Sequence, residues 1–229
     1  GVSVPPYDDG AGGGGLNLGT HVGDEPAAVE RNRTLLRSIL PSEPVWLNQV
    51  HGVEVVDASD VQTGSPAPDA DASIAARPGV VCAIMTADCM PVLIADRNGR
   101  VVGAAHAGWR GLAAGVIEAT VRRMRNEGGT DLVAWLGPGI GPARFEVGGE
   151  VLQAFARLGD EAQKAFVPVA GATGKYLADL PRLARIALSG VGVTEVAGGE
   201  HCTISEPGNF YSFRRDRVTG RMATLIWIK

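Results

Sequence analysis

Three short apolar runs in the middle of the chain constrain its fold more than any other feature. They cover residues 80–85, 92–95 and 101–105 and contain almost no polar side chain. Runs of this length and composition are typical of strands that are covered on both faces. Asn98-Gly99 separates the second run from the third and predicts a hairpin turn between them. The sequence therefore predicts central strands buried under other layers.

Helices are expected on both sides of these runs. Asp24-Glu25-Pro26 favours a helix start, because a proline near the first turn and acidic side chains both suit a helix N-terminus. We expect this helix to run to about residue 40, with a stripe toward the core formed by Leu35, Leu36, Ile39 and Leu40. Further helices are predicted over 111–127, 150–158 and 179–188, and Gly128 is placed to end the first of these.

Additional strands are predicted at 45–50, 53–56, 132–136 and 224–228. His51-Gly52 interrupts the first pair, where the glycine permits a bulge or a turn. Residues 8–15 are rich in glycine and residues 60–71 in proline and polar side chains, so both are expected to be loops. No repeat and no convincing linker divides the chain. We therefore expect one α+β domain of the mixed α/β kind, covering residues 1–229.

Charge and composition restrict the class of partner. The net charge is −4 and there is no long basic run, so nothing favours nucleic acid or an anionic membrane surface. The longest apolar stretch, residues 80–87, is far shorter than the roughly 20 residues that span a bilayer. The three cysteines cannot all pair within one chain and no export signal is visible, which together favour a cytoplasmic protein. A small molecule is the expected partner.

Three reactive side chains follow apolar runs. His51, Cys89 and His106 each lie close to a glycine or proline, where the backbone leaves regular strand geometry. If these positions meet, two imidazoles and a thiolate form a ligand set for zinc that keeps the fourth position open. Their spacing matches no compact zinc signature, so a buried thiol and two unrelated histidines are the alternative interpretation.

Two further features are candidates for ligand contacts. Arg110 lies at the entrance to the helix predicted after Gly108, where its guanidinium could hold a phosphate or a carboxylate, or could simply face solvent. The glycine- and proline-rich segment 137–142 lacks the lysine and hydroxyl of a phosphate-binding loop and is expected to be a rigid turn that forms a wall. His201 and Cys202 are adjacent, which is unfavourable for joint metal ligation.

Several motifs, taken in order, resemble the YfiH-like laccase-domain family nearly end to end. They are Asn17-Leu18-Gly19, Gln49-Val50-His51-Gly52, Thr86-Ala87-Asp88-Cys89-Met90-Pro91, His106-Ala107-Gly108-Trp109-Arg110-Gly111, Phe145-Glu146-Val147-Gly148, Lys175-Tyr176 with Asp179-Leu180, and Phe213-Arg214-Arg215-Asp216. The resemblance implies a four-layer sandwich of mixed sheets flanked by helices. It also implies one zinc ion held by His51, Cys89 and His106.

The activity implied by this resemblance is phosphorolysis of purine nucleosides, namely adenosine, inosine, guanosine and methylthioadenosine, with adenosine deamination as a side activity. Asn17, Gln49, Asp88 and Glu146 are the expected substrate-binding residues, and His51, Cys89, His106 and Arg110 the expected catalytic ones. We expect zinc and Arg110 to orient phosphate, and Asp88 either to carry a proton or to orient a histidine. A monomer or a homodimer is expected.

Other functions fit the same residues. The older family label is a multicopper phenol oxidase, but the chain has four histidines, too few for a mononuclear plus a trinuclear copper set. A single copper ion with two histidines, a cysteine and a methionine is conceivable. Cys89 and His106 also suit a cysteine hydrolase. An enzyme that edits peptidoglycan precursors and a non-catalytic metal-binding module are the remaining alternatives.

Overall fold

The computed structural model describes residues 1–8 and 14–229, so most of the loop predicted at 8–15 lies outside the described part. The elements in chain order are α1 (Pro26–Arg37), β1 (Val55–Asp57), η1 (Ala58–Asp60), β2 (Ala72–Ala75), β3 (Cys82–Thr86), β4 (Met90–Asp96), β5 (Val102–Ala107), α2 (Trp109–Ala114), α3 (Val116–Asn126), β6 (Leu132–Leu136), β7 (Glu146–Gly148), α4 (Gly149–Ala154), η2 (Ala156–Leu158), α5 (Asp160–Gln163), β8 (Phe166–Pro168), β9 (Lys175–Ala178), α6 (Leu180–Gly190), β10 (Val196–Gly198), α7 (Phe213–Asp216) and β11 (Met222–Ile226).

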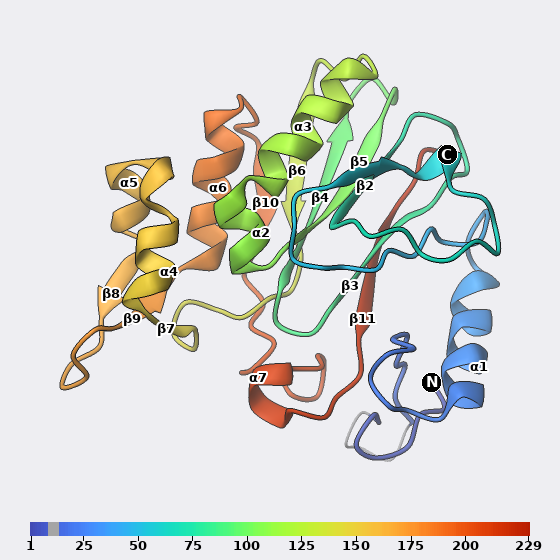
Figure 1. The fold of residues 1–229 in the computed structure, drawn as a ribbon. Helices are drawn as coiled ribbons and strands as arrows, with labels where there is room; N and C mark the ends of the chain where they lie inside the picture. Colours follow the sequence, from blue (N-terminus) through green and yellow to red (C-terminus); the bar gives the residue numbers. More distant parts are fainter. Residues whose placement is uncertain (9–13) are drawn as a thin grey trace.

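A mixed six-stranded sheet with strand order β1-β2-β5-β4-β6-β10 forms the centre of the molecule (Figure 1). β1 runs parallel to β2 and β10 parallel to β6, whereas the pairs β2–β5, β5–β4 and β4–β6 are antiparallel. The predicted hairpin connects β4 and β5, and the backbone N–H of Gly99 donates to the carbonyl of Asp96 over 2.9 Å. This hairpin fixes which residues of β4 and β5 share an end of the sheet.

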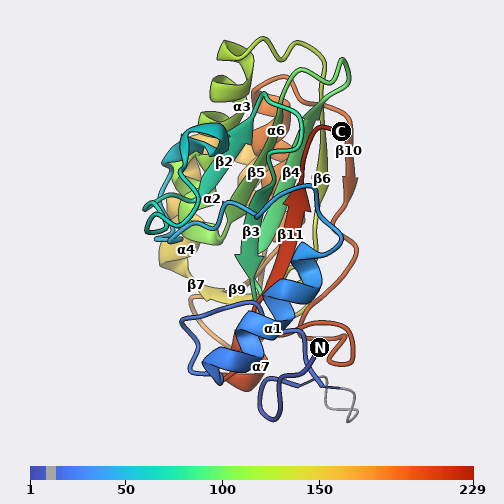
Figure 2. The same cartoon turned by 90° about the vertical axis from the view of Figure 1, so that its right-hand side faces the viewer.

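Other layers cover both faces of this sheet. Helices α2, α3 and α6 lie on one face, and the antiparallel pair β3–β11 lies on the other (Figures 1 and 2). Helix α1 lies outside that pair, toward one end of it (Figure 2). The small antiparallel sheet β7-β9-β8 lies beside α4. This arrangement confirms the predicted mixed α/β sandwich of mixed sheets flanked by helices.

The three central apolar runs become β3, β4 and β5. Every residue of β3 and β5 is buried, and β4 leaves only Leu93 and Ala95 half-buried. One cluster of apolar side chains lies between the sheet and the helices and includes Ile94 and Leu112, and a second includes Ile84 of β3 and Val102 of β5. The prediction of strands covered on both faces is therefore confirmed.

Helix α1 buries a different face from the one predicted. Leu35 and Ile39 are 52% and 77% exposed, while Ala28, Val29 and Asn32 are buried. The predicted apolar stripe is wrong because a polar network determines the packing here. The Asn32 amide donates to the Ser3 hydroxyl and to two backbone carbonyls of the N-terminal segment, so this segment covers the Asn32 face.

Two predicted helices are each divided in the structure. Residues 111–127 form α2 and α3, because Gly115 between them has a φ of 105°, which glycine adopts without strain. Gly128, with a φ of 86°, follows the end of α3 close to the predicted position. Residues 150–158 form α4 and η2. Among the described residues, no helix is both long and apolar enough to cross a membrane.

The strand predicted at 45–50 is wrong, because only two isolated bridges form there, Val45 with Cys82 and Asn48 with Asp69. The strand predicted at 53–56 begins later, as β1. The sequence did not predict β2, although all four of its residues are buried. Alanine and serine dominate β2, and such small side chains carry little of the hydrophobic pattern on which strand prediction depends.

Candidate metal centre

The three predicted ligands meet at one end of the central sheet. Cys89 immediately precedes β4 and His106 is the second-last residue of β5, whose partner opposite is Pro91. The antiparallel register of the hairpin therefore brings Cys89 and His106 to the same end of the sheet. His51 reaches them from the bend before β1, where its φ of 63° lies in the left-handed region.

The geometry of the three side chains suits one transition-metal ion. Their ligand atoms all lie within 4.8 Å of one another, and the Cys89 Sγ is 3.8 Å from the His51 Nε2. The rings of His51 and His106 are 4.8 Å apart between centroids and inclined by 67°. Tetrahedral zinc with its usual bond lengths requires about 3.6 Å between a thiolate sulfur and an imidazole nitrogen. Only a small closure is needed to reach this value.

Asp71 organises two of the three ligands. Its carboxylate is fully buried and accepts the backbone N–H groups of Val50, His51 and Gly52 over 3.1, 2.9 and 2.6 Å. The same carboxylate lies 2.8 Å from the Nδ1 of His106. One buried anion therefore holds the bend that carries His51 and leaves the Nε2 of His106 as the nitrogen for a metal. A carboxylate behind a histidine ligand is the usual support of a metal-binding imidazole.

The electrostatics of the cluster favour a thiolate. Burial acts to raise the pKa of the Cys89 thiol. Hydrogen bonds with His106 and His51 have a larger opposite effect, and the pKa falls to about 6. Burial lowers the pKa of His106, and its hydrogen bonds with Asp71 and Cys89 raise it to about 9. Burial also acts to raise the pKa of Asp71, but hydrogen bonds from His106 and Gly52 outweigh it and the pKa is lowered. The thiolate is the form of cysteine that binds metals.

Gly108 leaves the space in which the ligands meet. A Cβ at this position would lie 2.8 Å from the Cys89 Sγ and 3.2 Å from the His51 Cδ2. Both distances are shorter than ordinary van der Waals contacts, so any side chain here would displace the thiol. The glycine is required by the close approach of the cluster rather than by its backbone angles, because its φ is −62°.

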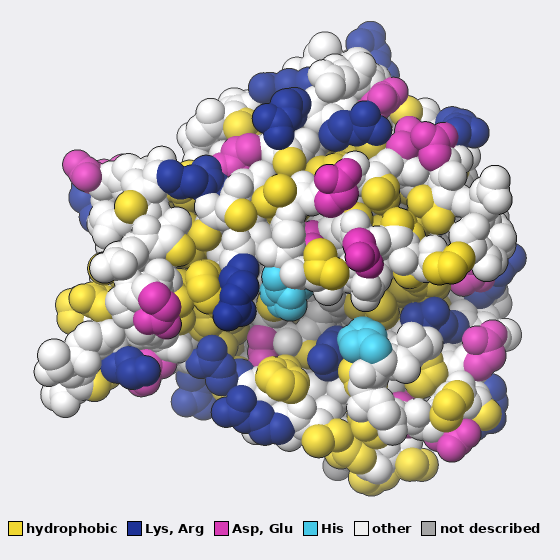
Figure 3. Space-filling model, viewed as in Figure 1, with side chains coloured by type: hydrophobic (Ala, Val, Ile, Leu, Met, Phe, Trp, Pro, Cys, Tyr) yellow, Lys and Arg dark blue, Asp and Glu magenta, His cyan; other side chains and the backbone are white. Residues whose placement is uncertain are grey.

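The cluster forms part of the wall of a cavity of about 370 Å³. Small-molecule sites in proteins occupy roughly 300–1,000 Å³, so this cavity has room for a small ligand. Its lining includes the three predicted ligands, His51, Cys89 and His106. The other lining residues are His21, Leu47, Asn48, Gln49, Met85, Thr86, Ala87, Phe213 and Arg221. Histidine and basic side chains surround a recess in the surface on this side of the molecule (Figure 3).

Among the predicted substrate-binding residues, Gln49 alone lines this cavity. Its amide is hydrogen-bonded on both sides to the backbone of Met85, at 2.8 Å for each bond. Asn17 is completely buried, and its side chain is bonded to Gly19, Asp24 and the backbone N–H of Arg221. Asn17 thus holds the backbone of Arg221, which lines the cavity, and its substrate contact stays a prediction.

Asp88 lies next to the Cys89 ligand but has no hydrogen bond with a histidine in the described residues. Its carboxylate accepts the hydroxyl of Thr203 over 2.6 Å and the backbone N–H of Arg214 over 2.5 Å. The residue itself has a φ of 93°, which is rare outside glycine. In this structure its carboxylate holds the segment that begins α7, and its predicted role as a proton carrier or as the partner of a histidine stays a prediction.

Glu146 and Arg110 are both exposed and do not line the cavity. The backbone carbonyl of Glu146, in β7, accepts from the Arg214 guanidinium over 3.1 Å. Arg110 lies in the first turn of α2, with its guanidinium 4.5 Å from the centroid of the Trp109 ring. Their predicted roles at the substrate therefore stay predictions.

Sequence reasoning missed four residues of the site, namely His21, Asp71, Phe213 and Arg221. Asp71 ends a long polar loop, where a single carboxylate has no distinguishing pattern. Phe213 was part of a quoted motif, but the local sequence gave no indication that it reaches the cavity. Arg221 precedes β11 and was not singled out, because its position opposite the ligands depends entirely on the tertiary fold.

The segment 137–142 supports the turn before Cys89 but does not line the cavity, so its expected role as a wall stays a prediction. The backbone N–H of Ile140 donates to the carbonyl of Asp88 over 2.8 Å, and Gly139 bridges to Cys202. His201 contacts Glu206 at 3.1 Å and stands apart from the cluster. Within residues 1–8 and 14–229, His51, Cys89 and His106 are the one group of potential ligands close enough to hold a metal ion.

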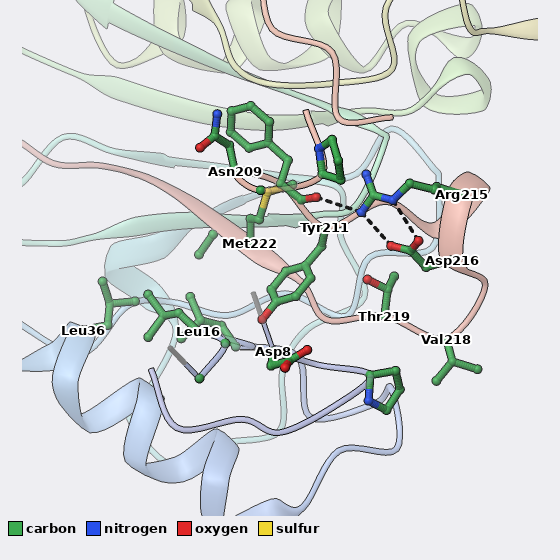
Figure 4. Close-up of a pocket in the computed structure, with 18 residues that line it drawn as sticks. Asp8, Leu16, Leu36, Asn209, Tyr211, Arg215, Asp216, Val218, Thr219 and Met222 are labelled. Carbon is green, nitrogen blue, oxygen red and sulfur yellow. Dashed lines mark hydrogen bonds and ion pairs between the residues drawn. The ribbon is translucent and has the colours of Figure 1, made fainter. Parts of the chain in front are cut away.

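A second and larger cavity, of about 750 Å³, lies between the N-terminal segment, α1 and the segment 207–223 (Figure 4). Its lining includes an ion pair between Arg215 and Asp216 at 2.6 Å, and the hydroxyl of Tyr211, which donates to the carbonyl of Tyr7. No described cluster of metal ligands faces it. We therefore assign the chemistry to the smaller cavity, in which the reactive groups converge.

The fold and the cluster together define a mixed α/β protein with a candidate centre for a single metal ion that opens into a small-molecule cavity. The chain belongs to the multi-copper polyphenol oxidoreductase laccase family, whose model matches residues 1–229. This result confirms the resemblance inferred from the motifs.

Relatives and solved structures match over the full chain. The chain is 54% identical to Purine nucleoside phosphorylase PA4543 of Pseudomonas aeruginosa and 51% identical to Purine nucleoside phosphorylase YfiH of Escherichia coli, in each case over 100% of this chain and 90% of the relative. The crystal structure of Neisseria meningitidis protein NMB0706 superposes with a TM-score of 0.90 at 48% identity, covering 100% of this chain and 90% of that one. YlmD from Geobacillus stearothermophilus superposes with a TM-score of 0.88 at 30% identity, covering 99% and 87%.

The family description names several copper ions, but this chain does not supply the ligands for them. It contains four histidines, His21, His51, His106 and His201. Two of these belong to the cluster, and no second group of potential metal ligands occurs in the described part of the chain. The arrangement is therefore that of one metal site.

Proposed function

We propose that the protein is a zinc-dependent purine nucleoside phosphorylase. It would cleave adenosine, inosine, guanosine or methylthioadenosine with phosphate to give the free base and ribose 1-phosphate. The observation that carries this proposal is the convergence of His51, Cys89 and His106 on one wall of a cavity of about 370 Å³. The names of the relatives at 54% and 51% identity support the same activity. The proposed partners are a nucleoside and phosphate, for a cytoplasmic monomer or homodimer.

The donor set supports zinc as the metal. Two imidazoles and one thiolate are ligands that zinc accepts in catalytic sites, and three protein ligands leave a position for a substrate oxygen or for water. When bound, the ion would supply a fixed positive charge and Lewis acidity next to the cavity. Copper is the alternative metal, and Met85, which also lines the cavity, is a candidate for a weak additional ligand.

The side chains of the cavity have separate roles in this proposal. Asp71 keeps the Nδ1 of His106 hydrogen-bonded, so the orientation of that ring does not change during the reaction. Phe213 is 47% exposed although it is a large aromatic side chain, and it offers a face against which a purine can stack. Leu47 and Met85 provide apolar surface nearby.

Phosphorolysis replaces the bond between the sugar carbon C1′ and the base nitrogen by a bond between C1′ and a phosphate oxygen. The bond between C1′ and the base nitrogen breaks, its electron pair leaves with the base, and the base gains a proton that balances the one phosphate loses on becoming an ester. A phosphate oxygen forms the new bond to C1′. With water in place of phosphate, its oxygen would attack the purine carbon that bears the amino group. The bond from that carbon to the amino nitrogen would break, and ammonia would leave to give inosine, which is the basis for proposing adenosine deamination as a side activity.

A cysteine hydrolase is a second candidate, which the electrostatics of the cluster favour. The pKa of Cys89 is lowered to about 6 and that of His106 is raised to about 9, as in a reactive thiolate–imidazolium pair. The two candidates differ in their need for metal. Activity that survives complete removal of metal and is lost on alkylation of Cys89 would favour the hydrolase.

The test is analysis by liquid chromatography of the products formed from adenosine, with and without phosphate. Phosphate-dependent formation of adenine and ribose 1-phosphate is expected, and the Cys89→Ala variant should form neither. Cys202→Ala is the matched control, because Cys202 is a half-buried thiol outside the cavity. Inosine as the sole product would identify a deaminase, and no product from any purine nucleoside would contradict the proposal.

A further inference from the structure

Two half-buried arginines near the cavity, Arg33 and Arg221, have no carboxylate partner within residues 1–8 and 14–229. Other arginines of the chain, such as Arg157 and Arg215, pair with a carboxylate at 2.7 and 2.6 Å. Burial lowers the pKa of both Arg33 and Arg221, and nearby anions oppose this effect, Glu30 and Glu43 at Arg33 and Cys89 and Asp88 at Arg221. A half-buried guanidinium that makes no direct ion pair is suited to binding an anion from solution.

Arg221 is held rigidly at the cavity wall. Its backbone N–H donates to the Asn17 Oδ1 over 2.8 Å, and its Nη1 donates to the carbonyls of Thr219 and Gly220 over 3.1 and 3.0 Å. A guanidinium has five N–H groups, of which Nη1 carries two. The Nε and Nη2 groups have no acceptor among the described residues, so one edge of the guanidinium stays available. This edge can bind two oxygens of one anion at the same time.

Packing on both sides fixes the stem and the plane of Arg221. A Cβ at Gly19 would lie 2.8 Å from the Arg221 Cγ, so the glycine allows the stem to pass close to the backbone. The guanidinium lies 5.9 Å from the centroid of the Phe213 ring, and both residues line the metal cavity. Little side-chain freedom remains to be lost when an anion binds.

His21 adds an imidazole to the same cavity wall. It lines the cavity together with Arg221 and the three candidate metal ligands. Its pKa is lowered first by burial and then by the charges of Arg221 and Arg33, so the neutral imidazole is favoured at pH 7. A neutral imidazole can donate one N–H to an anion held by Arg221.

We propose that Arg221 and His21 form an anion subsite of the candidate metal cavity that binds inorganic phosphate. This inference rests on the proposed function and identifies the place of its second substrate. It assigns to Arg221 the phosphate contact that the sequence had suggested for Arg110. Arg110 is exposed, stacked on Trp109 and absent from the cavity lining, whereas Arg221 faces the same space as the His–Cys–His cluster.

Equilibrium dialysis with radiolabelled inorganic phosphate, in the absence of nucleoside, tests the subsite directly. The metal-loaded protein is compared with Arg221→Gln, Arg221→Lys, Arg110→Gln and the matched control Arg122→Gln, whose arginine is exposed on α3. Loss of a bidentate charge-assisted contact should weaken phosphate binding about 10- to 100-fold in Arg221→Gln. Arg221→Lys should recover part of the affinity, and the other two variants should bind as the parent does.

The kinetic readout separates positioning of phosphate from general damage. Arg221→Gln should raise KM for phosphate by a similar factor and change KM for the nucleoside much less, with an unchanged melting temperature. Unaltered phosphate binding in Arg221→Gln, loss of binding in Arg110→Gln, or no phosphate binding by the parent protein would each overturn the inference. Phosphate binding that depends on Arg221 in a protein without phosphorolytic activity would support the subsite and reject the proposed function.

Discussion

Cys82 and Cys89 lie at opposite ends of β3 and have opposite properties. Cys82 is completely buried at the start of the strand, within the apolar cluster that includes Leu47 and Ile84. Burial raises its pKa to about 12. Cys89, beyond the other end, is half-buried beside two histidines, and their hydrogen bonds lower its pKa to about 6. One thiol is an apolar core group, and the other is a thiolate ready to bind a metal.

The difference shows that neighbouring groups decide the chemistry of a thiol in this fold. Burial acts to raise the pKa of both cysteines. At Cys82 the neighbouring Ser73 hydroxyl acts in the opposite direction but does not overcome burial. At Cys89 two imidazoles, one of them supported by the Asp71 carboxylate, outweigh it. A charged partner with its own counter-ion is what distinguishes the site from the core.

The largest expected difference between the two thiols is in alkylation. In metal-free protein at pH 7, pKa values of about 6 and about 12 give thiolate fractions of about 0.9 and about 10⁻⁵. Iodoacetamide should therefore modify Cys89 rapidly and leave Cys82 intact until the protein unfolds. Mass spectrometry of a Cys202→Ala background measures this selectivity. Similar alkylation of both thiols in folded protein would remove the distinction.

Cys89→Ala and Cys82→Ala should have very different effects on metal binding. Cys89→Ala removes one of the three proposed ligands, so zinc affinity and the rate of phosphorolysis should each fall by more than about 100-fold. This loss exceeds the roughly 10- to 100-fold typical of a residue that only supports a metal ligand. Cys82→Ala should retain the metal content and the activity of the parent protein. Elemental analysis after dialysis, together with product formation, measures both. Zinc retained at full occupancy in Cys89→Ala would disprove the ligand assignment.

Asp71→Asn tests whether the supporting carboxylate creates the difference. Loss of its charge behind His106 should lower metal affinity about 10- to 100-fold. Asp96→Asn is a matched control, because Asp96 is also buried and accepts three backbone N–H groups, from Arg100, Thr130 and Asp131. Both variants should lose stability, but Asp96→Asn should keep the affinity for metal. Chelator competition measures the affinity, and equal losses in both variants would show that Asp71 acts only on folding.

The pH dependence of metal binding should reflect the Cys89–His106 pair. Between pH 6 and 9 the metal-free pair is a thiolate and an imidazolium, so zinc must displace about one proton, from His106. Zinc affinity should then rise by about tenfold per pH unit across this window, and more steeply below pH 6, where Cys89 must also lose a proton. Calorimetry in buffers of different ionisation enthalpy counts the protons. A pH-independent affinity between 6 and 9 would contradict the pair.

The smallest effect concerns stability at Cys82. Removing its buried sulfur by Cys82→Ala should lower the free energy of unfolding by about 1 kcal/mol, a typical value for a small core truncation. Urea denaturation of metal-loaded protein measures the change. A loss several times larger would show that Cys82 has a role beyond packing.

Much of the candidate metal centre could be predicted, because its potential ligands follow apolar runs and lie near glycine or proline. The Asn98-Gly99 turn fixed the pairing of β4 with β5, and this pairing places Cys89 and His106 at one end of the sheet. The central strands were equally predictable, since both of their faces are apolar and such runs have few alternative structures.

The parts that could not be predicted depend on single polar contacts between distant segments. Asn32 turns α1 away from its apolar stripe by bonding to the N-terminal segment. Asp71 and Arg221 reach the site from a loop and from a strand entrance, and neither has a local pattern that marks it. Hydrophobic periodicity reports burial, but it does not report which buried polar group finds which partner.

Hydrogen bonds of Asp88 connect the cavity wall that carries Cys89 to the wall that carries Phe213. This residue directly precedes the Cys89 ligand, while its carboxylate grips Thr203 and the backbone N–H of Arg214, the neighbour of Phe213. One carboxylate therefore joins the backbone that positions Cys89 to the segment that positions Phe213. The relative position of these two walls is therefore fixed within the chain, and a rearrangement of the candidate metal ligands would also move Phe213.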